Sequence, residues 1–269
     1  MPDANKHQTA GCAPEFVSRI LQQALDSGQR IFAIAGLQGT GKSTLSAQLA
    51  DLARSQGRRV VPLSIDDFYL GHAERQRLGR DVHPLCATRG APGTHDVPLA
   101  CAVLDALAEG RPTALPRFDK IADDRLPESR WPTVDGADLT LLEGWFLKVP
   151  PEDPAALEDP INRLEREEDP DGTWRRWVNQ ALANDDPALW QRLPRMLFLQ
   201  GPGFDVVPRW RWQQEQTLQA AHPDRHAMTH PQVMRFVQFF ERVSRQAMRT
   251  LPAIADGTIR LDAERNPLD

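Results

Sequence analysis

The sequence predicts an α/β fold in which helices cover both faces of a mostly parallel sheet. Short continuous apolar runs, such as RIFAIAG at residues 30–36, are typical of strands buried on both faces. Amphipathic segments of helical length separate these runs, and strands that alternate with helices indicate a parallel sheet. The chain has 269 residues, of which 41% are hydrophobic and 26% charged, so it is long enough to bury the core of such a fold.

The predicted elements follow a loose tail at residues 1–13. The first helix, residues 14–27, places apolar side chains on one face and stops at Gly28. The second strand, residues 58–66, contains Pro62, which favours a position at a sheet edge or bulge. We expect one domain over residues 14–269, with a helical insertion at about 149–193. The other predicted elements are strands at 30–36, 139–147, 196–200 and 258–262, and helices at 43–56, 98–109, 204–221 and 232–250.

Charge and composition exclude several classes of protein. The chain carries 32 Lys and Arg against 37 Asp and Glu, a net charge of -5, whereas a general nucleic-acid binder needs a basic excess. No run approaches the ~18 apolar residues of a membrane span. The three cysteines, Cys12, Cys86 and Cys101, lack paired or CxxC spacing and suit a reducing cytoplasm. We therefore expect a cytoplasmic protein without nucleic-acid or membrane partners.

One motif identifies a nucleotide site. The segment GLQGTGKS at residues 36–43 matches G-x-x-x-x-G-K-[ST], with a predicted strand before it and a helix after it. Its glycines let backbone amides surround phosphates, Lys42 neutralises the β- and γ-phosphates, and the Ser43 hydroxyl binds Mg²⁺. This motif predicts a three-layer sandwich of the P-loop NTPase type. The predicted nucleotide-binding residues here are Gly36, Gln38, Gly39, Thr40, Gly41, Lys42, Ser43 and Thr44.

The motif is shared by several classes of enzyme, and absences narrow the choice. The chain has no N-K-x-D sequence to read guanine and no Ser-Gly-Gly transporter signature, and it is short for a motor. These absences favour phosphate transfer to a small molecule.

Carboxylates end two of the predicted strands. Asp66 and Asp67 close the second strand, and Glu143 lies in the run LTLLEG. The carboxyl ends of parallel strands line the active crevice, so these acids are expected beside the P-loop. Either aspartate could accept the proton of an attacking hydroxyl, and Glu143 is a candidate Mg²⁺ ligand. Two polar loops, residues 83–96 and 115–125, lie between them in the sequence and are expected to contact the acceptor.

These segments together resemble a known family. SIDDFY, RFDKIADDR and the strand with LEG resemble the phosphoribulokinase, uridine kinase and pantothenate kinase group of P-loop kinases. More narrowly, HPLCATRGAPGTHD, LLEGW, PINRLEREEDPDGTWRRWVN and GPGFDVVPRWRWQQE resemble the D-glycerate 3-kinase family of plants, fungi and bacteria. The resemblance covers roughly residues 15–265.

The resemblance implies ATP and Mg²⁺ as cofactors, D-glycerate as acceptor and 3-phosphoglycerate as product. It implies that Asp66 rather than Asp67 is the base, that Glu143 is the strand-end acid, and that Arg125, which closes the acceptor segment, is a further catalytic residue. Arg209 and Arg211 fall where related kinases place a mobile lid, so one of them is a candidate for meeting charge on the migrating phosphate.

The acceptor segment departs from relatives that phosphorylate nucleosides. Those relatives carry Tyr-Asp and a histidine where this chain has Phe118-Asp119 and Asp123-Asp124. The departure fits a small hydroxy acid whose carboxylate binds a cation, and we expect Arg89 or Arg125 to be that cation. The predicted substrate residues are Asp66, Tyr69, Arg89, Thr94, His95, Asp96, Arg117, Lys120 and Arg125.

Two alternatives stay open at this point. The chain could be a related kinase with another acceptor, such as pantothenate, a sugar or a nucleoside. It could also be a non-catalytic ATP-binding regulatory module, which would have no use for Asp66 opposite Arg89 and Arg125. The sequence does not determine the oligomeric state.

Overall fold

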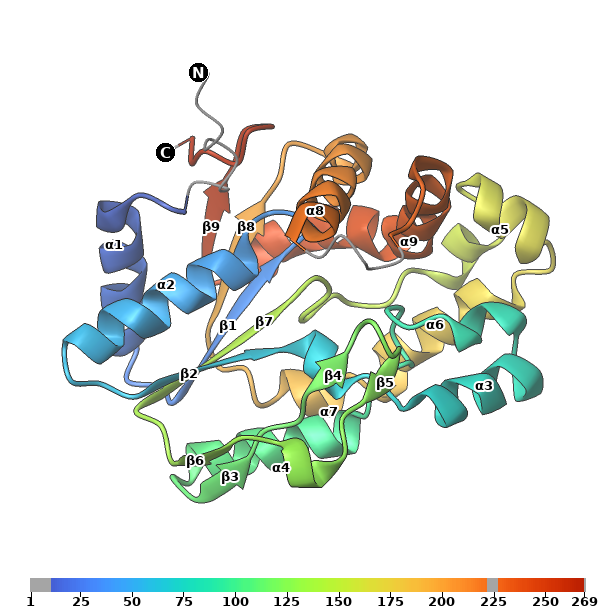
Figure 1. The fold of residues 1–269 in the computed structure, drawn as a ribbon. Helices are drawn as coiled ribbons and strands as arrows, with labels where there is room; N and C mark the ends of the chain where they lie inside the picture. Colours follow the sequence, from blue (N-terminus) through green and yellow to red (C-terminus); the bar gives the residue numbers. More distant parts are fainter. Residues whose placement is uncertain (1–10, 222–226, 269) are drawn as a thin grey trace.

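The computed structural model describes residues 11–221 and 227–268, so most of the predicted N-terminal tail lies outside the described residues. Five strands form one sheet in the order β2-β7-β1-β8-β9, and every neighbouring pair is parallel (Figure 1). This arrangement confirms the predicted α/β class. The strands are β1 (Ile31–Gly36), β2 (Val60–Ser64), β7 (Leu139–Gly144), β8 (Met196–Gln200) and β9 (Gly257–Arg260).

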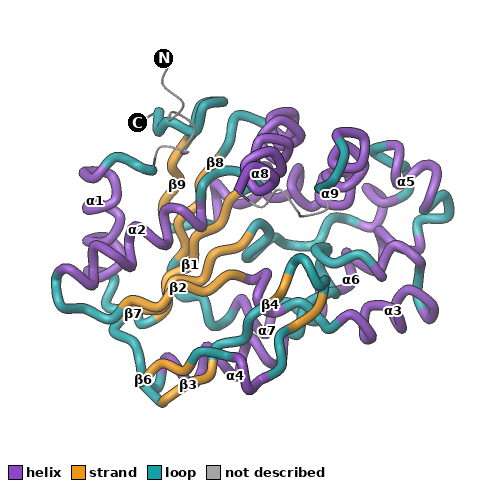
Figure 2. The backbone as a smooth tube through the Cα atoms, viewed as in Figure 1, coloured by secondary structure: helices purple, strands orange, loops and turns teal. Residues whose placement is uncertain are grey.

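Helices cover both faces of the sheet, because successive strand residues point to opposite sides. Phe32 and Ile34 of β1 belong to the core shared with α1 (Pro14–Asp26) and α2 (Lys42–Ser55). Ile31, Ala33 and Ala35 belong instead to the larger core on the other face, with helices α4 (Val97–Ala108) and α9 (His230–Ile254). Figure 2 shows the sheet between these two sets of helices. The chain therefore forms the predicted three-layer sandwich.

The segment at 149–193 is helical and packs into the larger core. Trp174, Val178 and Leu182 of α6 lie in the same cluster as Phe239 of α9. Two short antiparallel pairs, β3 with β6 and β4 with β5, lie outside the main sheet. The remaining elements are α3 (His72–Asp81), α5 (Arg163–Glu168), α6 (Thr173–Asn184), α7 (Pro187–Trp190), α8 (Val207–Ala221), β3 (Pro112–Ala114), β4 (Phe118–Asp119), β5 (Asp124–Arg125) and β6 (Thr133–Asp135).

The boundaries of the predicted elements hold within a few residues. The strand predicted at 139–147 ends at Gly144, and the buried residues that follow it are not in the sheet. The structure also contains helix α3 and the short strands β3, β4, β5 and β6, which the sequence did not indicate. Pro62 lies on β2, an edge strand, as its missing N–H requires. Among the described residues, no helix is long and apolar enough to cross a membrane.

Candidate active site

The P-loop connects the carboxyl end of β1 to the start of α2, at the centre of the sheet. Gly41 has φ +91° and Gly39 has φ +84°, values that side chains other than glycine rarely adopt. A Cβ atom at Gly39 would also lie 2.6 Å from Trp210 Cβ, so the loop has no room there for a side chain. The Thr40 hydroxyl donates to the Leu37 carbonyl at 2.9 Å and closes the turn. The loop backbone is therefore fixed in the shape that surrounds phosphates.

Two polar side chains of the loop are buried with few hydrogen-bond partners. Lys42 Nζ donates to the Leu37 carbonyl at 2.9 Å, and burial lowers the pKa of this lysine while Glu143 and Asp66 oppose the shift. The side-chain nitrogen and oxygen of Gln38 are buried with no hydrogen-bond partner in the described part of the chain. An ammonium and an amide without full partners favour an anionic ligand.

Glu143 meets the P-loop across the sheet. It lies on β7 beside β1, and Ser43 Oγ donates to its Oε1 at 2.8 Å. Ser43 and Thr44 are exposed at the start of α2, whereas Glu143 is 7% exposed. The structure thus brings together the hydroxyl and the carboxylate that the sequence predicted as Mg²⁺ ligands.

Asp66 and Asp67 follow β2 in a short 3₁₀ turn, residues 65–68, but they have different partners. Asp66 accepts from the Tyr69 hydroxyl at 2.7 Å and from Lys120 Nζ at 2.6 Å. Asp67 instead pairs with Arg117, whose Nη1 lies 3.2 Å from its Oδ2. The charge of Asp66 also favours the protonated form of Lys42 and opposes the lowering of its pKa by burial.

The pKa values of the two aspartates are also shifted in opposite directions. Burial raises the pKa of Asp66, but Lys120 and the Tyr69 hydroxyl outweigh it and hold the pKa at about 2. Burial raises the pKa of Asp67 above its usual value despite the nearby Arg117. Burial, together with the charge of Asp66, raises the pKa of Tyr69 well above its usual value. Tyr69 is therefore a hydrogen-bond donor to Asp66 at neutral pH.

The predicted acceptor loop at 83–96 lies beside Asp66, and backbone hydrogen bonds join it to the residues that follow Asp66. Leu70 N donates to the Thr94 carbonyl at 2.9 Å, and Asp96 N donates to the Phe68 carbonyl at 2.7 Å. His95 is 6% exposed, and both of its ring nitrogens lack a hydrogen-bond partner in the described residues. Its ring lies 4.7 Å from that of Tyr69, and burial lowers its pKa to about 4. Thr94 is fully buried, and its hydroxyl bonds Gly90 N and the Ala91 carbonyl within its own loop.

The predicted carboxylate-binding arginines already have carboxylate partners. Arg125 Nη1 donates to Asp96 Oδ2 at 2.9 Å, and its Nε donates to the Tyr69 carbonyl. Arg89 pairs with Asp123 and lies over the Phe118 ring, 5.4 Å from its centroid. Asp96 also caps α4 by accepting from Leu99 N at 3.0 Å. These two ion pairs join the loops at 83–96 and 115–125, so the charges of the predicted acceptor residues are paired internally.

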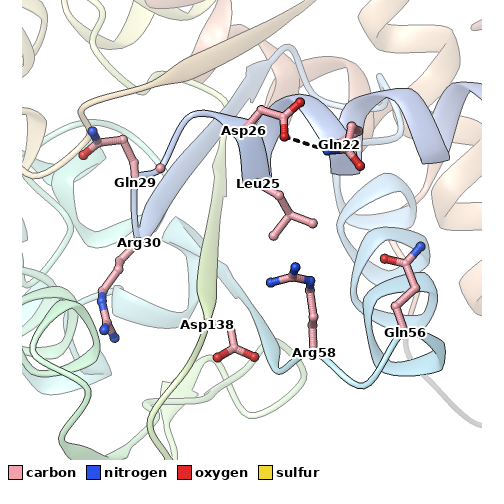
Figure 3. Close-up of a pocket in the computed structure, with 9 residues that line it drawn as sticks. Gln22, Leu25, Asp26, Gln29, Arg30, Gln56, Arg58 and Asp138 are labelled. Atoms are coloured by element: carbon pink, nitrogen blue, oxygen red, sulfur yellow. Dashed lines mark hydrogen bonds between the residues drawn. The ribbon is translucent and has the colours of Figure 1, made fainter.

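A separate cavity of about 460 Å³ lies at the amino ends of the strands, opposite to the P-loop (Figure 3). It is lined by Arg30, Arg58 and Asp138, which precede strands β1, β2 and β7, and by residues of α1. None of the predicted nucleotide or acceptor residues lines it. The candidate active site lies instead at the carboxyl ends of the strands, where ligands bind in open parallel sheets.

Comparison with known proteins identifies the family. No family model matches the chain. The chain is 34% identical over 220 residues to the uncharacterized kinase mug58 of Schizosaccharomyces pombe, a match that covers 78% of each protein. It is 31% identical over 258 residues to the chloroplastic D-glycerate 3-kinase of Arabidopsis thaliana, covering 86% of this chain and 52% of that protein. This chain belongs to the D-glycerate 3-kinase family of P-loop kinases.

The solved structure of the D-glycerate 3-kinase from Cryptococcus neoformans has the same fold. It superposes with a TM-score of 0.75 at 24% identity, over 95% of this chain and 96% of that one. The chain spans about half the length of the Arabidopsis relative. Membership of this family makes the protein a small-molecule kinase that uses ATP.

In this kinase, the predicted lid cations lie on helix α8. Arg209 donates to the Ala263 carbonyl at 2.5 Å, and Arg211 pairs with Glu215 at 3.1 Å and lies over the Phe236 ring. Whether either reaches the transferred phosphate stays a prediction.

A cation that the sequence did not indicate also touches the P-loop. Arg265 donates to the Gly39 carbonyl, and its guanidinium lies 4.9 Å from the centroid of Trp210. No local motif marks this contact, because residues 39 and 265 meet only in the folded chain.

Proposed function

We propose that the protein transfers the γ-phosphate of ATP to the 3-hydroxyl of D-glycerate and releases 3-phosphoglycerate and ADP. The proposal rests on the family and on one observation, the convergence of three strand ends. The P-loop follows β1, Glu143 lies at the end of β7 and Asp66 follows β2. A phosphate group and a hydroxyl can therefore meet at the carboxyl ends of these three neighbouring strands. A nucleotide-binding regulatory module would not need Asp66.

Lys42 and the P-loop amides would hold the transferred phosphate. Lys42 Nζ can exchange the Leu37 carbonyl for β- and γ-phosphate oxygens, which are stronger acceptors. The helix that begins at Lys42 adds its N-terminal dipole at the same point. The chain's own groups therefore neutralise charge on the migrating phosphate.

Ser43 and Glu143 fit a magnesium ion bound to the nucleotide. Among the described residues, no cluster of three or more His, Cys, Asp or Glu could hold a metal ion. Mg²⁺ in kinases takes only one or two protein ligands and completes its shell with phosphate oxygens and water, so this pair suffices. Bound there, the ion would offset charge on the β- and γ-phosphates.

Asp66 would accept the proton of the glycerate hydroxyl as its oxygen attacks the γ-phosphorus. The new P–O bond forms while the bond to the ADP oxygen breaks, and the proton moves to a carboxylate oxygen of Asp66. The Tyr69 hydroxyl, which donates at 2.7 Å, holds the carboxylate in one orientation. The buried and unpartnered His95 nitrogens are suited to hydrogen bonds with the other glycerate hydroxyl.

We also propose that the enzyme works in the cytoplasm. Its three cysteines are free thiols, which a reducing compartment maintains.

An acceptor panel tests the proposal. ADP release would be measured with D-glycerate, L-glycerate, glycerol, pantothenate and uridine, and the product would be identified by ³¹P NMR. We expect D-glycerate to give the highest kcat/KM and 3-phosphoglycerate as the product. Faster turnover of pantothenate or uridine, or 2-phosphoglycerate as the product, would contradict the proposal.

A further inference from the structure

The tip of the β4–β5 hairpin covers Asp66. Lys120 follows strand β4, and its ammonium donates to Asp66 Oδ2 at 2.6 Å. The Tyr69 hydroxyl occupies the other carboxylate oxygen. A positive charge in contact with a carboxylate stabilises its ionised form and so weakens it as a proton acceptor. In the free protein, the proposed base is therefore neutralised by a side chain 54 residues away.

Lys120 differs from the other cations around the acceptor site in how it is held. The guanidinium groups of Arg89 and Arg125 each bond a carboxylate and a backbone carbonyl, and their side chains are 23% and 18% exposed. The Lys120 side chain is 60% exposed, and in the described residues Asp66 is the one group that its ammonium bonds. Of these cations, Lys120 can leave its partner at the lowest cost.

The hairpin that carries Lys120 is itself fixed. Asp119 Oδ1 accepts from Ile121 N at 2.9 Å and from Ala122 N at 3.0 Å, which closes the turn. At the far end of the turn, Asp123 pairs with both Arg75 and Arg89. The backbone around Lys120 is therefore held in place, and rotation of its side chain is enough to move the ammonium away from Asp66.

An acceptor with its own anionic group would compete for this ammonium. D-Glycerate carries a carboxylate on the same small molecule as the hydroxyl to be phosphorylated, so both groups reach Asp66 and Lys120 together. Glycerol and water carry no such group. They would have to attack while Lys120 stays on Asp66.

We propose that Lys120 is a substrate-released latch on the catalytic base. In the free enzyme Lys120 neutralises Asp66, and the carboxylate of a bound hydroxy acid takes over the ammonium and frees Asp66 to accept the hydroxyl proton. The latch rests on the proposed function, because it requires Asp66 to be the base. It makes the anionic group of the acceptor a condition for turnover, which suppresses phosphate transfer to water and to neutral alcohols.

Substitution of Lys120 tests the latch. Lys120→Met keeps the length of the side chain and removes its charge, and Lys120→Gln serves as a second neutral variant. We expect each to raise the KM for D-glycerate about tenfold or more, as loss of a charged hydrogen bond implies. We also expect each to increase ATP hydrolysis without acceptor, and glycerol phosphorylation, several-fold, with the KM for ATP unchanged.

Two further variants serve as controls. Lys120→Arg retains a cation and should restore low hydrolysis without acceptor, together with part of the affinity for glycerate. Arg80→Met removes an exposed cation from α3, outside the proposed site, and should leave all rates unchanged.

The outcomes separate the latch from the proposed function. If the wild-type protein phosphorylates D-glycerate but the neutral variants show no rise in hydrolysis or glycerol turnover, the latch is wrong and the proposed function stands. A rise in the KM for glycerate alone also overturns the latch, because Lys120 would then bind the substrate without restraining the base. If the wild-type protein does not phosphorylate D-glycerate, the proposed function fails first.

Discussion

At the phosphate-binding end of the site, consecutive residues 36–44 form the binding loop, whereas at the acceptor end three segments distant in sequence meet. The phosphate end is one strand, one turn and the start of one helix. The acceptor end combines residues 66–70, 89–96 and 117–125, which backbone hydrogen bonds and ion pairs hold together. A short local motif is thus sufficient at one end, while the other depends on the tertiary fold.

The two ends also differ in how their charges are satisfied. At the phosphate end, the buried Lys42 bonds a carbonyl and no carboxylate among the described residues, so it awaits an anion. At the acceptor end, Arg89, Arg117, Lys120 and Arg125 each pair with an aspartate. An anion can bind at the first end by addition, but at the second it must replace an existing partner. Specificity for the acceptor therefore depends on which pair opens most readily.

Lys42→Ala is expected to have the largest effect, because it removes the buried cation of the phosphate end. Loss of a group that stabilises transition-state charge costs about 10²–10³ in kcat, and we expect transfer to fall at least that far. Steady-state kinetics and circular dichroism would be measured together. Arg54→Ala, an exposed position on the same helix, is the control and should retain activity. Near wild-type transfer in folded Lys42→Ala would remove the nucleotide-site assignment.

Asp66→Asn is the corresponding test at the acceptor end. Loss of a general base lowers kcat by about 10²–10⁴, and we expect this with the affinity for ATP largely kept. Asp67→Asn is a matched control, since this neighbour bonds Arg117 rather than Tyr69 and Lys120. It should lower kcat much less. The reverse ranking of the two variants would assign the base to Asp67.

The same contrast explains what could be predicted from the sequence. Periodicity and the P-loop motif predicted the sheet, its main helices and the residues at the phosphate end, because each depends on neighbours in the chain. Helix α3 was not predicted, since HAERQRLGRD has no apolar stripe. Its one buried residue is Arg75, whose guanidinium bonds the carbonyls of Leu70, Ala87 and Asp123. Such long-range polar burial leaves no pattern in the sequence.

The pairing of charges at the acceptor end escaped prediction for the same reason. The sequence marks Arg89 and Arg125 as cations in polar loops, but their partners Asp123 and Asp96 are 34 and 29 residues away. Nothing in the spacing shows that these groups neutralise each other. The assignment of the carboxylate-binding cation to Arg89 or Arg125 therefore stays a prediction.

Glu143→Gln tests the junction between the two ends, with a smaller expected effect. The Ser43 hydroxyl would keep a hydrogen-bond partner at this position, but the amide is a weaker ligand for Mg²⁺ than a carboxylate. We expect the Mg²⁺ concentration for half-maximal activity to rise about tenfold, with partial recovery of kcat at saturating Mg²⁺. Titration of activity with Mg²⁺ at fixed ATP would show this. An unchanged titration would exclude a metal role for Glu143.

The smallest expected effect is on the free energy of unfolding. Because His95 belongs to the acceptor end, this effect appears as a loss of stability at acidic pH. Burial lowers the pKa of His95 to about 4, whereas a histidine in the unfolded chain has a pKa near 6.5. Each unit of difference between these two pKa values corresponds to about 1.4 kcal/mol of folding free energy. Between these values the unfolded chain binds a proton that the folded one does not. The stability that neutral His95 contributes is therefore complete above pH 6.5 and lost as the pH falls toward 4. From pH 7 to pH 5 the wild-type protein should lose roughly 2 kcal/mol more than His95→Gln, as measured by urea unfolding. Equal losses in the two proteins would mean that His95 becomes protonated in place, and that the acceptor end admits water and charge as readily as the surface does.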